Sequence, residues 1–409
     1  MPIFVYTIRR LGESHPDHVI SPSINSMAKS KKPIQADAQL IVAASETDAN
    51  LLYATRFFAP DPFIFFVHRG KKFLVMSDLE IDRARQQALV HSVLSLSQFE
   101  KELKESKRKV IDTAAVLQVL FSSKKIHSLL VPYGFPVGLT EQLRRRGFRI
   151  IVKPDPFFGE REVKQPEEIR EIEKALRAAE AGMEAGIETI KNSKIHSNGT
   201  LYWNGSKLTA EVVRQQINHV ILNKGCIATH TIVAGGNQGC DPHHEGSGPL
   251  KAHQPIILDI FPRSQDSGYW GDITRTVVRG RAGERLKAMF RAVLRGQEIA
   301  FRQIKAGAKG NEIHQSILDY FNQQGFETSR QNNRMQGFFH GTGHGVGLEI
   351  HEAPRISPKA KERLRAGHVV TVEPGLYYSG LGGMRLEDLV VVTGAGNRNL
   401  TRFPKNLEV

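Results

Sequence analysis

The chain has 409 residues, of which 40% are hydrophobic and 24% charged, and its formal net charge is +14. This length suits two domains of ordinary size, and the composition is that of a globular protein. No run approaches the ~18 apolar residues of a transmembrane helix, and the N-terminal apolar stretch is too short for a secretory signal, so we expect a cytoplasmic protein without a membrane span.

The basic charge does not by itself indicate a nucleic-acid partner. Lysine and arginine are spread along the chain, and their short clusters at 104–109 and 144–146 adjoin helical patterns without interleaved aromatic side chains. Solvated helix faces explain such clusters better than a nucleic-acid site does. The two cysteines, Cys226 and Cys240, are too few for a disulfide framework and lack the spacing of a zinc site.

The first part of the chain is predicted to hold a tail and then an α/β domain. Residues 1–35 are polar and without sustained periodicity, so we expect a disordered tail. Met27 looks like a natural chain start, and deletion of residues 1–26 is expected to leave activity unchanged. From 36 to 155, β-type runs alternate with helical ones, which indicates a mixed sheet and, since no catalytic constellation is present, a recognition or oligomerisation domain. The β-type runs are 40–44, 63–67, 73–76, 128–131 and 148–152.

A second domain is predicted from 160 to 409. The segment KPDP at 153–156 indicates a linker because proline breaks helices and central strands, and Pro166 then opens a long amphipathic helix. Two helices followed by β-type runs occur twice, which indicates two half-units enclosing one cleft. The helices after the first are near 208–222, 284–304 and 311–324, and the β-type runs are 228–234, 255–261, 269–278, 369–377 and 384–392.

Four of these β-type runs each carry one carboxylate among apolar and β-branched neighbours: Asp259, Asp272, Glu373 and Glu387. Unpaired acids in such positions lose hydration and repel one another, so a bound divalent cation would remove the conflict. The alternative for the first pair is an aspartate that is solvated or paired with Arg275. Four acids suit two cations, which also usually need a nitrogen ligand.

The segment FFHGTGHGVGLEIHE offers that nitrogen through His340, His344 and His351, and its glycines allow close backbone approach. It lacks the spacing of a phosphate-binding loop, and Pro354 excludes a zinc-protease helix after His351. Any single histidine is more often structural than a ligand. Because four acids need a partner, a role as metal ligand becomes the better interpretation for one of these histidines.

Taken together, Asp259, GDITRT, HGTGHGVGLEIHE, TVEPG and RLED resemble the motifs of the pita-bread metallopeptidases, the family of methionine aminopeptidase, aminopeptidase P and prolidase. The N-terminal domain and the linker EREVKQPEEI are similar to those of the creatinase, aminopeptidase P and prolidase branch. The resemblance implies an α/β (α+β) fold with a creatinase-like α/β domain followed by a pita-bread domain. The latter has two pseudo-symmetric halves, each built of helices and an antiparallel sheet.

The resemblance also implies a dinuclear metal site. Its ligands would be Asp259, Asp272, His344, Glu373 and Glu387, with Asp272 and Glu387 bridging the ions. Manganese is the metal it favours, with cobalt or zinc as alternatives. The implied reaction is hydrolysis of an N-terminal Xaa-Pro peptide bond by a metal-bridging hydroxide.

Further roles follow from the same resemblance. His243 and His351 would contact the scissile carbonyl or shuttle protons, Glu373 would take up a proton, and Arg385 would orient the site or substrate. His244 could exchange roles with His243, because adjacent histidines are indistinguishable in a sequence. A peptide substrate and a homodimer are the expected partners.

Two features depart from the family pattern. Asp272 follows Asp259 by 13 positions, a longer interval than usual, and Phe261 replaces a common glycine. We expect a longer turn to absorb both, with Asp266 solvated in it, and His340 to be structural. The alternatives are a metal-free creatinase-like amidinohydrolase, or a catalytically silent binding protein for a protein or nucleic-acid partner.

Overall fold

A computed structural model describes residues 35–108 and 110–409. The predicted tail, apart from Gln35, and Met27 lie outside the described residues. The compact unit Ala36–Val409 contains all the elements below. None of the helices in the described ranges is long and apolar enough to cross a membrane.

The N-terminal part is built on a mixed sheet, as predicted, with the strand order β4-β3-β2-β1-β5-β6, in which β4 was not among the predicted β-type runs. β1 pairs antiparallel with β2, and β2 with β3, whereas β3–β4, β1–β5 and β5–β6 are parallel. The strands are β1 (Ala38–Ala43), β2 (Phe63–His68), β3 (Lys71–Met76), β4 (Ser92–Ser95), β5 (Ser128–Pro132) and β6 (Arg149–Lys153). The helices are α1 (Ala49–Thr55), α2 (Ile81–Gln87), α3 (Leu96–Glu105), α4 (Thr113–Ser123) and α5 (Val137–Arg145).

Both faces of this sheet are covered, because successive side chains of a strand point to opposite sides. Phe66 belongs to one core with Phe121 of α4, and its neighbour Phe65 belongs to the other core with Leu51 of α1. This explains why β2 is apolar over four consecutive residues instead of alternating.

The linker passes through the short 3-10 helix η1 (Gly159–Glu162) into α6 (Pro166–Lys191). Pro166 occupies the first turn, and Gln165 and Glu168 form a capping box that satisfies free backbone N–H groups. α6 packs against α7 (Ala210–Leu222). Gly186 permits this approach, since a Cβ there would lie 2.8 Å from the Ile217 side chain.

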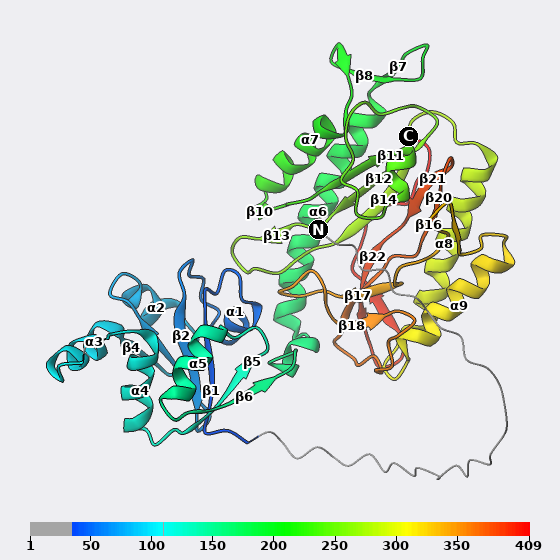
Figure 1. Ribbon diagram of the computed structural model, residues 1–409. Helices are drawn as coiled ribbons and strands as arrows, with labels where there is room; N and C mark the ends of the chain where they lie inside the picture. The colour runs from blue at the N-terminus through cyan, green and yellow to red at the C-terminus, as the bar shows by residue number, and fades with distance from the viewer. Residues whose placement is uncertain (1–34, 109) are drawn as a thin grey trace, which may run out of the picture. The chain divides into compact units, whose positions relative to one another are not determined.

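The C-terminal part consists of two helix-plus-sheet halves, and Figure 1 shows its strands between the helix pair α6 and α7 and the pair α8 (Glu284–Gln303) and α9 (Gly310–Gln323). The first half has the antiparallel sheet β11-β12-β14, and the second has the sheet β18-β17-β19-β22-β23 and the ribbon β20-β21. The first-half strands are β11 (Ile232–Gly235), β12 (Pro255–Ile260) and β14 (Ile273–Val278). The second-half strands are β17 (Gly343–Gly345), β18 (Glu352–Ile356), β19 (Val369–Val372), β20 (Gly375–Tyr378), β21 (Gly382–Arg385), β22 (Asp388–Val392) and β23 (Asn397–Asn399).

Short pairs complete the fold: β7 (Lys194–Ile195) and β9 (Ser206–Lys207) with β8 (Leu201–Trp203), β10 (Cys226–Ile227) with β13 (Arg263–Ser264), and β15 (Ser329–Gln331) with β16 (Arg334–Gln336). The 3-10 helix η2 (Gly236–Cys240) follows β11. β13 lies in the long turn between β12 and β14. The additional residues of this turn thus form a short strand that pairs with β10.

The expectation that all four acids lie inside strands is wrong for three of them. Asp259 is in β12, but Asp272 precedes β14, Glu373 falls in the break between β19 and β20, and Glu387 falls between β21 and β22. The apolar runs 369–377 and 384–392 are each divided at the acid. At a break in a strand, the side chain need not follow the alternation between the two faces of the sheet. Pro374 has no backbone N–H to donate to a neighbouring strand, so it enforces the break that follows Glu373.

Candidate active site

A cleft of about 760 Å³ contains all the residues predicted for metal binding and catalysis. Its wall also includes Phe261, His340 and Arg355. The predicted residues that line it are His243, Asp259, Asp272, His344, His351, Glu373, Arg385 and Glu387. Segments from both halves of the C-terminal part therefore converge on one space, as their order along the chain predicted.

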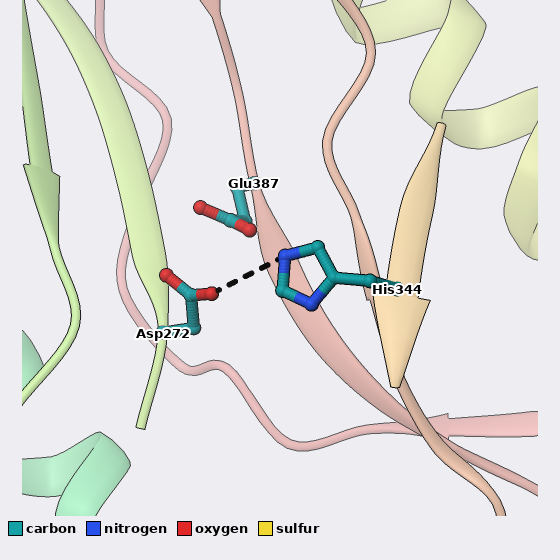
Figure 2. Close-up of side chains that lie close together, drawn as sticks. All are labelled: Asp272, His344 and Glu387. Carbon is teal, nitrogen blue, oxygen red and sulfur yellow. Dashed lines mark ion pairs between the residues drawn. The ribbon is translucent and has the colours of Figure 1, made fainter. Parts of the chain in front are cut away.

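Three of these side chains form a tight cluster. Asp272, His344 and Glu387 are buried, and one nitrogen or oxygen atom of each lies within 4.8 Å of those of the others. Figure 2 shows them pointing toward one another from separate segments, with 3.7 Å between His344 Nε2 and Asp272 Oδ2. His344 is supplied by β17, a strand of the second half, and Asp272 by the segment that enters β14 of the first half.

Glu373 and Asp259 flank this cluster. Glu373 Oε1 lies 3.3 Å from His344 Nε2, so it joins the cluster through the imidazole. Asp259 Oδ2 lies 2.7 Å from the Arg385 guanidinium. Asp259 is therefore paired with Arg385 and not with Arg275, whose guanidinium instead pairs with Asp388 at 2.9 Å.

Burial and mutual repulsion make the acids difficult to ionise together. Burial, followed by the charges of Glu387 and Asp259, raises the pKa of Asp272 well above its usual range. Burial and the neighbouring acids likewise raise the pKa of Glu387, and burial raises the pKa of Glu373 to about 7. A divalent cation would supply the missing positive charge, so this donor set fits metal ions.

His344 is suited to be the nitrogen donor. Burial, together with His351, lowers its pKa to about 3, so the imidazole is neutral at physiological pH. Its Nδ1 lies 3.2 Å from Gly345 O, which assigns the proton to Nδ1 and leaves the Nε2 lone pair facing the acids. Gly345 is required there, because a Cβ would lie 2.3 Å from Ala353 O.

Two threonines hold the acids in place, and the sequence interpretation missed both. Thr274 Oγ1 donates to Glu387 Oε2 at 2.7 Å. Thr371 Oγ1 accepts from the backbone N–H of His344 at 3.0 Å and donates to Glu373 Oε1 at 3.3 Å. Thr371 lies two residues before Glu373, the offset that returns to the same face of an extended chain, so this spacing was an available signal. Thr274 contacts an acid 113 residues away, and no local spacing marks that contact.

Of the two adjacent histidines, the structure places His243 in the cleft and His244 outside it. His244 Nδ1 accepts the backbone N–H of Gly246 at 2.9 Å and its side chain lines a neighbouring cavity. His351 is in the cleft with its ring centroid 4.4 Å from that of His344, and burial lowers its pKa. The ambiguity between His243 and His244 is thus removed by position.

Arg385 is the centre of a buried hydrogen-bond network that includes Tyr377, a residue the sequence interpretation did not single out. Besides Asp259, Arg385 donates to the Tyr377 hydroxyl at 2.8 Å, and that hydroxyl lies 2.9 Å from His340 Nε2. Burial, followed by the charge of Arg385, lowers the pKa of His340 to about 3. His340 therefore reaches Asp259 only through Tyr377 and Arg385.

The departures from the motif pattern fall where the chain can absorb them. Phe261 lines the cleft, so it restricts the space beside Asp259. Asp266 is exposed in the long turn, as expected. Gly271 enters β14 where a Cβ would lie 2.4 Å from Leu176 N of α6, which fixes Asp272 against the helix.

Comparisons with known proteins cover the C-terminal part and, for the solved structures, about 90% of the chain. A family model described as Metallopeptidase family M24 matches residues 170–394. The Xaa-Pro dipeptidase of Pyrococcus horikoshii is 30% identical over 287 residues, which cover 69% of this chain and 75% of that protein. The Xaa-Pro dipeptidase of Pyrococcus furiosus is 32% identical over 248 residues, 60% of this chain and 64% of that protein.

Solved structures extend the likeness to both parts of the fold. An X-Pro aminopeptidase from Thermotoga maritima superimposes with a TM-score of 0.76 at 24% identity, covering 91% of this chain and 98% of that chain. The prolidase from Pyrococcus furiosus gives a TM-score of 0.72 at 25% identity, covering 90% and 97%.

Proposed function

The chain belongs to metallopeptidase family M24, as its motifs predicted, and from this premise we propose that it hydrolyses the bond between an N-terminal residue and proline in a peptide. The proposed specificity for proline rests on the relatives that are described as Xaa-Pro dipeptidases. The observation that carries the chemistry is the convergence of Asp272, His344 and Glu387 within 4.8 Å in a cleft large enough for a short peptide.

Two divalent ions would be held by Asp259, Asp272, His344, Glu373 and Glu387, with Asp272 and Glu387 shared between them. Manganese is the proposed metal, with cobalt and zinc as alternatives. When bound, such ions lower the pKa of a coordinated water and polarise a carbonyl group. The raised pKa values of the three buried acids support this assignment, because the metal-free site holds more carboxylates than it can ionise.

The other groups of the cleft handle protons and orientation. Glu373 lies at the edge of the cluster, with Oε1 3.3 Å from His344 Nε2, and would accept a proton there and return it to the leaving amine. His351, kept neutral by a lowered pKa, and His243 contact the scissile carbonyl. Arg385 holds the Asp259 carboxylate in position through their 2.7 Å ion pair.

We assign residues 36–155 to a domain that assists recognition and residues 160–409 to the catalytic domain, and the proposed assembly is a homodimer. Sedimentation of the purified protein tests the assembly. An isolated monomer that retains full activity would remove the dimer from the proposal.

The function is tested with Xaa-Pro dipeptides, Xaa-Pro-Yaa tripeptides and Met-Ala-Ser, each with added manganese, cobalt or zinc. We expect turnover of peptides with proline in second place and none of Met-Ala-Ser. Removal of the ions with a chelator abolishes that turnover, and readdition restores it. Turnover that survives exhaustive chelation would contradict the metal assignment.

A further inference from the structure

A second cavity, of about 550 Å³, adjoins the catalytic cleft. Pro242 and Phe339 line both spaces, so the cavity begins where the cleft ends. Tyr377, which contributes to the cavity wall, also carries the hydroxyl that binds Arg385 in the cleft. The two spaces are therefore neighbours across Pro242 and Phe339, and we call the second one the tail cavity.

The lining of the tail cavity suits peptide groups and a terminal carboxylate. Asn237 and Gln336 supply amide groups, and Arg334, on β16, supplies a cation. Among residues 35–108 and 110–409, no carboxylate lies within ion-pair distance of Arg334. The carboxylate of Asp241 in the same wall accepts a hydrogen bond from the His243 backbone N–H at 3.2 Å.

The direction of the substrate follows from the reaction. An enzyme that removes one N-terminal residue has a single residue on the amino side of the scissile bond, and all remaining residues lie on the leaving side. On the amino side only the side chain of that one residue could enter a cavity, and about 550 Å³ is more than one side chain fills, so the size of the cavity favours the leaving side. Arg334 agrees with this direction, because a guanidinium repels the α-ammonium group of the substrate and attracts its C-terminal carboxylate.

Resting on the proposed function, we propose that the tail cavity binds the part of the substrate beyond proline, with Arg334 binding the C-terminal carboxylate of a tripeptide. The substrates are then Xaa-Pro-Yaa peptides as well as Xaa-Pro dipeptides. A dipeptide ends at proline, inside the cleft, and does not reach Arg334. Arg334 is thus a specificity residue for substrate length.

The test compares Ala-Pro with Ala-Pro-Ala in the full-length metal-loaded enzyme and in the variant Arg334→Gln. We expect kcat/KM for Ala-Pro-Ala to fall about five- to tenfold, mainly through KM, because a uniform binding contact to the tail is lost. The kcat/KM for Ala-Pro stays unchanged. Amidation of the C-terminus of Ala-Pro-Ala lowers wild-type kcat/KM by a similar factor, and Arg334→Gln adds no further loss on that peptide.

Arg330→Gln is the matched control, since Arg330 is an exposed arginine on the same hairpin but outside the cavity wall. It removes the same charge and leaves both substrates unaffected. A second variant, Ser379→Trp, places bulk at an exposed position of the wall and lowers turnover of the tripeptide without changing that of Ala-Pro. Equal losses on both substrates, or none, would overturn the proposal.

Binding of the product Pro-Ala gives a readout that does not need catalysis. Calorimetry with the metal-free protein is expected to show weaker binding in Arg334→Gln than in the wild type and in Arg330→Gln. Wild-type enzyme that hydrolyses Ala-Pro but not Ala-Pro-Ala would refute the tail cavity while the proposed function stands. If the wild-type enzyme hydrolyses neither peptide, the proposed function itself is refuted.

Discussion

The side-chain amide of Gln297 donates a 2.9 Å hydrogen bond to Val372 O, the carbonyl just before Glu373. The same nitrogen lies 3.4 Å from Leu386 O, the carbonyl just before Glu387. One buried residue of α8 thus ties together the two strand breaks that carry acids. Its Oε1 is buried without a hydrogen-bond partner in the described part of the chain, so the NH₂ group is the part of this amide that does the binding.

We predict that Gln297→Met weakens metal binding without preventing folding. Methionine has a similar volume, but both hydrogen bonds are lost and the segments that carry Glu373 and Glu387 become less constrained. Loss of such supporting contacts typically costs about 10-fold or more in metal affinity. Calorimetric titration of the metal-free protein with manganese measures this. Val293→Ala is the control, because Val293 packs in the same core from α8 and its truncation lowers stability without changing metal affinity.

Replacement of Asp272 or Glu387 by alanine is predicted to prevent the binding of two ions per chain and to abolish turnover at the same time. Each acid is a member of the tight cluster with His344, and the remaining ligands cannot hold two ions without a shared carboxylate. Elemental analysis of the purified variants and assay with Xaa-Pro dipeptides provide the measurements. Full activity in either variant would remove it from the ligand set.

The contribution of Glu373 to the stability of the metal-free protein is predicted to fall as pH rises from about 6.5 to 8. Burial raises the pKa of Glu373 from 4.5 to about 7, so in this range the folded state binds a proton that the unfolded state has already lost. Folding stability therefore decreases as pH passes through 7, by about 1 kcal/mol for this group. The buried histidines oppose this slope: burial lowers the pKa of His344 to about 3, so between pH 6.5 and 8 the unfolded state loses an imidazole proton that the folded state does not carry.

Thermal or urea unfolding with chelator present, at pH 6.5 and pH 8, measures this difference. Glu373→Gln removes the titrating group, keeps the shape of the side chain and retains the histidines, so the wild type should lose about 1 kcal/mol of stability relative to this variant between the two pH values. In the metal-loaded protein the trend reverses, because the ions bind the ionised carboxylates. A chelated wild type that keeps or gains stability relative to Glu373→Gln toward pH 8 would contradict the prediction.

Arg385→Met is predicted to lower kcat about 10- to 100-fold, the range typical when a partner of a metal ligand is removed. The variant leaves Asp259 without its 2.7 Å ion pair and frees that carboxylate to rotate. Tyr377→Phe removes only the hydroxyl that joins Arg385 to His340 and serves as the milder comparison. Steady-state kinetics on an Xaa-Pro dipeptide decide the matter. Equal rates in Arg385→Met and wild type would show that Arg385 has no orienting role.

Much of the architecture followed from local patterns. The mixed sheet was predicted from alternating apolar runs, and the two halves of the catalytic part from helix pairs followed by β-type runs. The interruptions at Glu373 and Glu387 were missed, because an apolar run on either side of an acid is indistinguishable from a single strand until its partners are known. Gln297 was missed for a related reason: an amide on an amphipathic helix looks solvent-facing until the strands beneath it are in place.

The order of acids and histidines along the chain determined which residue types would meet, because metal ligands and their motifs are encoded by identity and spacing. Only the tertiary structure decided that His243 and not His244 enters the cleft, that Asp259 is held by Arg385, and that Thr274 and Thr371 orient the acids. These choices depend on contacts between segments more than a hundred residues apart for the pairs Asp259 with Arg385 and Thr274 with Glu387. Spacing along a chain carries no information about which way such side chains turn when the segments meet.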